Sequence, residues 1–206
     1  MKSRKGLHGG AYKPLTEGDI TKIHQASMQV FEEVGIQVNY PEALAAFQEI
    51  GAEIDHKTNI VKLKADQVKR LLVEVPESIV LHGRDPSGEH DLEIGGTKVY
   101  MGTGGTALNV QEAGSATARR AQLKDVRDMA RMVESLNNIH FYMLNVYPSD
   151  LPVEEIDVNR FGAALNSTNK HIMGGVYTLE GVRNVIRMAE KIADSPEALR
   201  QKPFIS

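Results

Sequence analysis

The sequence predicts an α/β chain in which a mixed region of helices and antiparallel strands is followed by parallel βα units. Two patterns in the 206 residues indicate this fold class. Up to about residue 120, short apolar runs alternate with helical patterns, and the later runs show the period-two alternation of antiparallel sheet. From residue 121 onward, longer units of helix and strand alternate, which is typical of parallel architectures.

Residues 1–14 are expected to form a flexible N-terminus, because their basic start is followed by no apolar stretch of the kind that a signal peptide carries. Residues 15–120 are expected to form a mixed α+β N-terminal extension. Thr16 is a good N-cap for its first helix, and Gly35 is suited to end that helix. The predicted elements are helices over 16–34, 41–50 and 65–75, a hairpin over 52–63, and antiparallel strands from 78 to 110.

Residues 121–206 are expected to form about three βα units, of which the last is incomplete. The pattern predicts helices over 122–136, 153–165, from 178 and over 196–201, and strands over 139–146, 171–177 and from 204. Such units occur in open doubly wound sheets and in barrels. Because the chain ends inside a predicted strand, we expect it to be part of a longer protein and to be inactive alone.

Composition excludes several classes of function. No apolar run approaches the roughly 20 residues that span a bilayer, and 24 basic against 27 acidic residues form no basic surface for nucleic acid. We therefore expect a cytoplasmic protein with neither a membrane nor a nucleic acid as partner. The absence of cysteine excludes thiolate chemistry, and the seven histidines have no metal-binding spacing, so no protein-bound metal is expected.

A glycine-rich stretch is the most informative local pattern. It consists of Gly102, Thr103, Gly104, Gly105 and Thr106. Such a loop can bring backbone N–H groups to an anion or a substrate, but it lacks the lysine of a phosphate-binding loop and is followed by a strand pattern. Spacing alone therefore favours a tight bend between strands.

Ligands of parallel βα proteins meet the carboxyl ends of the strands, so two places are candidate substrate-binding sites. At the first, Tyr147 offers an aromatic face to a cation and Asp150 offers a charge, although 148–150 equally fits a turn into a helix. At the second, Tyr177 ends its strand and Thr178 fits an N-cap better than a ligand contact.

No catalytic residues can be assigned from spacing. His140 and His171 begin strands, on the side of such folds that usually serves stability. The mixed charges from Arg119 to Asp128 fit a solvated helix face better than a docking surface. No nucleophile, base and acid occur in a recognisable arrangement.

Five segments taken together resemble the trimethylamine methyltransferase family. They are Leu15–Ile20, Phe31–Ile36, Gly102–Val110, Leu123–Val126 and Pro148–Pro152. Each is ordinary alone, but they occur in order over nearly the whole chain. The resemblance implies a TIM-type barrel behind an N-terminal extension, which agrees with the change of pattern near residue 121.

The resemblance also implies methyl transfer from a methylated or quaternary amine to the cobalt of a corrinoid, which a separate cognate protein carries. The enzyme would hold the amine cation over aromatic faces, for which Tyr147 and Tyr177 are the candidates, with Asp150 for charge complementarity. One branch of the family uses pyrrolysine for trimethylamine, at a position beyond Ser206. Because that branch is narrow, a quaternary amine such as glycine betaine is the favoured substrate.

Two alternatives stay open at this point. One is an unrelated barrel or doubly wound enzyme that binds an anionic ligand at Gly102–Thr106. The other is a non-catalytic module that binds quaternary amines. The sequence also leaves a homo-oligomer open.

Overall fold

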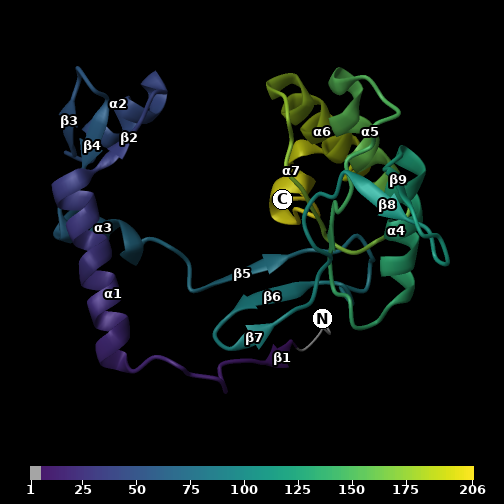
Figure 1. Ribbon diagram of the computed structural model, residues 1–206, viewed down its shortest axis with the longest axis horizontal. Coiled ribbons are helices and arrows are strands. Elements are labelled where there is room, and N and C mark those ends of the chain that lie inside the picture. Colours follow the sequence, from purple (N-terminus) through teal and green to yellow (C-terminus); the bar gives the residue numbers. More distant parts are fainter. Residues whose placement is uncertain (1–5) are drawn as a thin grey trace. The chain divides into compact units, whose positions relative to one another are not determined.

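The computed structural model describes residues 6–206, which form two compact units (Figure 1). The smaller unit consists of residues 10–77. The larger unit consists of residues 78–206 together with the segment before residue 10. The division therefore falls at residue 77, whereas the sequence pattern placed its change near residue 121.

The smaller unit contains three helices and a three-stranded antiparallel sheet in the order β2-β4-β3. Thr16 and Asp19 form a capping box at the first helix, and Gly35 ends that helix with a φ of 80°, as the sequence indicated. The elements are α1 (Glu17–Gln29) with the π-helical turn η1 (Val30–Val34), β2 (Ile36–Gln37), α2 (Pro41–Glu49), β3 (Glu53–Asp55), β4 (Ile60–Lys62) and α3 (Ala65–Val73).

Antiparallel pairing opens the larger unit. β5 (Ser78–Leu81) and β6 (Leu92–Gly95) pair as antiparallel strands, as the pattern over 78–110 predicted, and β7 (Lys98–Val99) follows (Figure 1). The expectation of a flexible start over 1–14 is wrong at Leu7–His8, which form β1 and pair with β7. Residues 1–5 of that expectation lie outside the described residues. Backbone hydrogen bonds to β7 order the segment despite its polar composition.

The glycine-rich stretch lies within the region predicted to be antiparallel sheet, but its pairing is parallel. Gly102 forms a parallel bridge with Phe141, and Ala107 forms one with Val146. His140 N–H donates to the Met101 carbonyl at 2.7 Å. The sequence pattern did not predict this parallel pairing, because a segment rich in glycine lacks the branched and aromatic side chains that are typical of buried strands.

Four parallel segments lie side by side in chain order. Segment 101–107 pairs with segment 140–147, which contains β10 (Tyr142–Met143). β10 pairs with β11 (Ile172–Met173), and Ile172 forms a parallel bridge with Ile205. The fold is therefore mixed α/β, with parallel neighbours in sequential order.

The connections between these segments carry the helices. They are the hairpin β8 (Asn109–Gln111) and β9 (Ala118–Arg120), then α4 (Leu123–Ser135), α5 (Val153–Leu165), α6 (Leu179–Ile192) and α7 (Pro196–Gln201). Tyr142, Leu144 and Val146 alternate toward these helices and belong to one buried apolar core with them. The helix bounds predicted from the sequence are confirmed to within one or two residues.

Two cationic side chains close helix ends inside this unit. Lys170 is 1% exposed, and its Nζ donates to the carbonyls of Val133 and, at 2.8 Å, Leu136 at the end of α4, and to that of Ile139 at 2.6 Å in the segment that follows. Arg84 donates to the Thr168 carbonyl at 2.8 Å and to that of Leu165, at the end of α5. The last carbonyls of a helix lack intrahelical partners, so a cation there satisfies them and complements the helix dipole.

A charged clamp fastens the hairpin β8–β9 to the start of α4. Arg119 donates to both carboxylate oxygens of Asp125, at 2.7 and 2.8 Å, and also contacts Glu112. The Asp125 side chain is 5% exposed, which corrects the expectation of a wholly solvated charge mixture on this helix. These hydrogen bonds from Arg119 hold the pKa of the Asp125 carboxyl well below its usual range.

Replacing Asp125 with Asn should lower stability at neutral pH by on the order of 1 kcal/mol, since the charged clamp loses its anion. Because the folded-state pKa is depressed, the stabilisation is complete above the unfolded-state pKa of about 3.9 and is lost as the pH falls below it. Between pH 6 and pH 3, the free energy of unfolding measured with urea should therefore fall less for Asp125→Asn than for the wild type. The exposed Asp128→Asn, on the same helix, is the control, and equal pH dependence of all three proteins would contradict the prediction.

Candidate functional site

Two tyrosines meet where neighbouring parallel segments end. Tyr147 closes the second segment, and its backbone N–H donates to the Ala107 carbonyl at 2.9 Å. Tyr177 follows the third segment. The two ring centroids lie 5.2 Å apart at an interplanar angle of 75°, the edge-to-face arrangement that aromatic quadrupoles favour. Tyr177 remains 48% exposed, so the pair presents aromatic surface at this edge of the sheet.

Two buried charged residues of α5 hold the Tyr177 backbone and ring. Both carboxylate oxygens of Asp157 accept from the Tyr177 N–H at 3.1 Å, and one of them accepts from the Thr178 N–H at 3.1 Å. The Arg160 guanidinium lies over the Tyr177 ring, 5.2 Å from its centroid. Each of these two side chains is 1% exposed.

Sequence reasoning missed Asp157 and Arg160, since both stand in an otherwise ordinary helical pattern. Their spacing was the available signal. They lie three residues apart, on the face of α5 that also carries the buried Ile156 and Phe161. Charged residues on the apolar face of a helix need partners inside the protein.

The third candidate, Asp150, bonds to the start of a helix and not to the two tyrosines. Its Oδ1 accepts from the Leu123 N–H at 2.9 Å, at the start of α4. Its neighbour Ser149 donates from both N–H and Oγ to the Ala121 carbonyl, at 2.8 and 2.9 Å. Residues 148–150 thus fasten the strand end to the start of a helix, which is the turn that the sequence left open as an alternative.

The hydroxyls of the glycine-rich stretch bond to the neighbouring segment. Thr103 Oγ1 donates to the Met143 carbonyl at 2.6 Å, and Thr106 Oγ1 donates to the Leu144 carbonyl at 3.4 Å. Gly102 packs so closely on the Phe141 ring that an added Cβ would lie 2.2 Å from Cζ. These residues therefore form an irregular segment that two isolated bridges and the threonine hydroxyls attach to its neighbour.

The histidines have structural partners. His140 Nδ1 accepts from the Met101 N–H at 2.9 Å. His171 is 1% exposed, with Nδ1 3.0 Å from the His82 carbonyl and Nε2 2.9 Å from Ser206 Oγ. Burial lowers the pKa of His171 and so favours its neutral form. The N-cap expected at Thr178 is confirmed, because its Oγ1 accepts from the Gly181 N–H at 2.9 Å.

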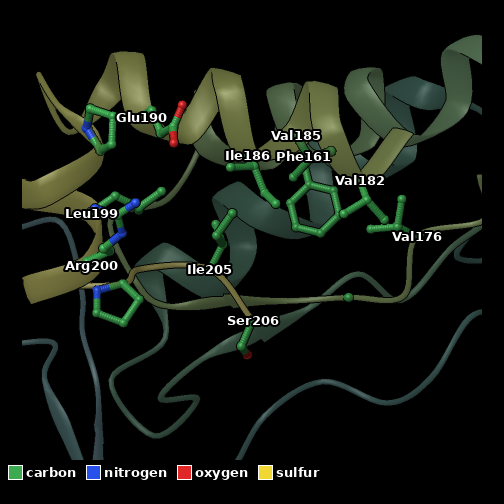
Figure 2. Close-up of a pocket in the computed structure, with 13 residues that line it drawn as sticks. Phe161, Val176, Val182, Val185, Ile186, Glu190, Leu199, Arg200, Ile205 and Ser206 are labelled. Carbon is green, nitrogen blue, oxygen red and sulfur yellow. The ribbon is translucent and has the colours of Figure 1, made fainter. Parts of the chain in front are cut away.

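A mainly apolar cavity of about 500 Å³ lies between the helices and the last strand (Figure 2). Ile186 of α6 faces Ile205 across it, and Val182 of the same helix lies beside Val176. Its polar side chains are Glu190 of α6, Arg200 of α7 and Ser206 at the end of the last strand. It contains none of the candidate residues, and its lining is that of a helix–sheet interface.

Two further observations concern residues 6–206 only. No three side chains of the metal-ligating types come together there as a site for an ion. Over the same residues, every helix is too short or too polar to cross a bilayer.

Comparisons with known proteins agree with the resemblance. The family model described as trimethylamine methyltransferase (MTTB) matches residues 5–206. Trimethylamine methyltransferase MttB of Desulfitobacterium hafniense is 27% identical over 97% of this chain and 40% of its own length. A protein of the same name from Methanosarcina barkeri is 32% identical over 97% of this chain and 41% of its own length. A glycine betaine methyltransferase of Desulfitobacterium hafniense is 26% identical over 94% of this chain and 40% of its own length. The chain thus spans about two fifths of the length of these curated relatives.

Close packing at Gly102 yields a prediction. Gly102→Ala should lower the free energy of unfolding by about 1–3 kcal/mol, because its Cβ would overlap the Phe141 ring. Gly104→Ala is the matched control, since Gly104 has open space and no left-handed backbone. We expect Gly104→Ala to change stability by less than about 1 kcal/mol. Equal losses in urea unfolding for the two variants would argue against the packing of Gly102 on its neighbour.

Proposed function

Because the chain belongs to the trimethylamine methyltransferase family, we propose that it forms part of an enzyme that transfers a methyl group from a methylated or quaternary amine to a corrinoid protein. The acceptor is the cobalt of the corrinoid, which a cognate protein carries. The chain spans about two fifths of its relatives, so this activity is proposed for the whole protein. A quaternary amine is the proposed substrate.

The observation that carries the proposal is the pair of rings of Tyr147, which is half-buried, and Tyr177, which is exposed, at the carboxyl ends of two parallel segments. Quaternary ammonium groups bind to aromatic faces because the ring quadrupole attracts the cation without requiring a hydrogen-bond donor. Ligands of parallel βα folds also bind at this edge. The sequential order of the four segments further supports a TIM-type barrel, with these rings at its mouth.

In the proposed mechanism, the ring pair holds the ammonium group and directs one methyl group outward. The corrinoid supplies the nucleophilic cobalt that accepts this methyl group, and the departing amine is neutral or, for a betaine, anionic. The partial exposure of the rings fits a cofactor presented from outside the chain by a partner protein. The chain's own contribution is to bind, orient and align the reacting carbon.

The alternative of an anion site at Gly102–Thr106 has less support. The hydroxyls of Thr103 and Thr106 already donate to strand carbonyls, which leaves the loop fewer donors for an anion. Asp150 remains a proposed contributor of charge. It would act at longer range than direct contact, because one carboxylate oxygen is engaged by the Leu123 N–H.

The test uses the intact protein, its reduced corrinoid protein and candidate amines, with formation of methyl-cobalt followed in the visible spectrum. We expect turnover with a quaternary amine. Tyr147→Leu should raise KM by about tenfold, since cation–π contacts contribute roughly 1–2 kcal/mol, whereas Tyr147→Phe should lose much less.

Tyr40→Leu serves as the control, because Tyr40 is an exposed ring in the smaller unit. Absence of methyl-cobalt with every amine would refute the proposed function. Equal KM values for Tyr147→Leu and Tyr40→Leu would remove the ring pair from it.

A further inference from the structure

Arg160 places a buried cation beside the aromatic pair. Its Nη2 donates to the Leu144 carbonyl at 3.1 Å, and its Nη1 approaches the Gly175 carbonyl at 3.5 Å. The guanidinium therefore joins the ends of the second and third parallel segments directly beneath Tyr177. Among residues 6–206 its Nε has no hydrogen-bond partner. Its described hydrogen-bond and ring contacts are thus two carbonyls and one ring face, and its charge also acts on the Tyr142 hydroxyl.

Within the described part of the chain, residues 6–206, no carboxylate forms an ion pair with this guanidinium. A guanidinium stays protonated at all physiological pH values. The nearest acid along α5, Asp157, makes its described contacts with the N–H groups of Tyr177 and Thr178 and with Thr178 Oγ1, and forms no ion pair with Arg160. With the side chain 1% exposed, water screens this charge poorly.

A fixed cation on one face of Tyr177 affects any ligand of the ring pair. The guanidinium occupies that face, so a second cation must use the remaining aromatic surface and is repelled by the first. A ligand that also bears a carboxylate gains attraction from the guanidinium. The affinity of this site for a methylated amine therefore depends on the net charge of the amine.

We propose that Arg160 is a specificity-determining residue that selects zwitterionic quaternary amines over amines carrying only positive charge. This inference rests on the proposed function, because it assumes that the ring pair binds the ammonium group. It assigns the charge preference to a residue of α5 that lies beneath the ring pair.

The test measures binding of two probes to the intact protein by calorimetry. Glycine betaine is the zwitterion, and the tetramethylammonium ion carries the same methylated head without a carboxylate. The wild type should prefer glycine betaine by on the order of tenfold. Arg160→Gln should bring this ratio close to one, mainly by tightening tetramethylammonium binding, whereas Arg160→Lys should keep most of it.

Two further variants separate charge selection from folding. Arg84→Gln is the matched control, because Arg84 also donates to buried carbonyls and lies over a ring, that of Phe204 at 5.8 Å, but has no contact with the tyrosines. It should lower the melting temperature and leave the ratio unchanged. Asp157→Asn removes the neighbouring negative charge while keeping an acceptor, so it should raise the ratio above the wild-type value.

The outcomes distinguish the inference from the function on which it rests. If the wild type binds both probes and Arg160→Gln weakens them equally, the inference is overturned while the proposed function stands. If Arg160→Gln does not fold, an unchanged ratio in Asp157→Asn overturns the inference. If the wild type binds neither probe, the proposed amine site fails, and the inference fails with it.

Discussion

Parallel pairing between segment 101–107 and segment 140–147 is the constraint on which the larger unit depends. Parallel neighbours require a crossover, so the chain between them must leave the sheet and return. The hairpin β8–β9 and α4 form this crossover, and the clamp between Arg119 and Asp125 joins them. The next parallel pairing, between β10 and β11, puts the ends of the second and third segments at one edge, which is why Tyr147 and Tyr177 come into contact.

Buried charges in this unit mostly bond to the backbone. Lys170 and Arg84 satisfy carbonyls at helix ends, Asp157 accepts backbone N–H groups at the start of α6, and Arg160 donates to strand carbonyls. Burying a charge without a partner costs free energy, and so does burying an unpaired backbone group. A buried charge that bonds to such a group reduces both costs. Loops and helix ends are held in this way at places where apolar packing alone would leave polar groups unsatisfied.

The sequence predicted most helices because their start and stop signals are local. Pro41 and Thr178 mark helix starts, and α5 coincides with its predicted range. Segment 102–107 escaped prediction because its strand character comes from packing, with Gly102 lying against Phe141. Arg160 and Asp157 escaped for a related reason, since their partners are backbone groups and a ring about 15 to 20 residues away that only the folded chain brings near. The sequence predicted that Tyr147 and Tyr177 lie at strand ends, and the structure brings their rings together. Their binding of a substrate stays a proposal.

The proposed chemistry places opposing demands on the ring pair. The ammonium group must be desolvated enough for the rings to attract it, yet its methyl carbon must stay reachable by a metal on another protein. A fully buried aromatic cage would meet the first demand and prevent the second. Here Tyr177 is held by Arg160 on one ring face and by the Asp157 contacts to its backbone, while it stays 48% exposed. Rigid support beneath an exposed aromatic surface meets both demands, because orientation comes from the buried charges and access comes from the open edge of the sheet.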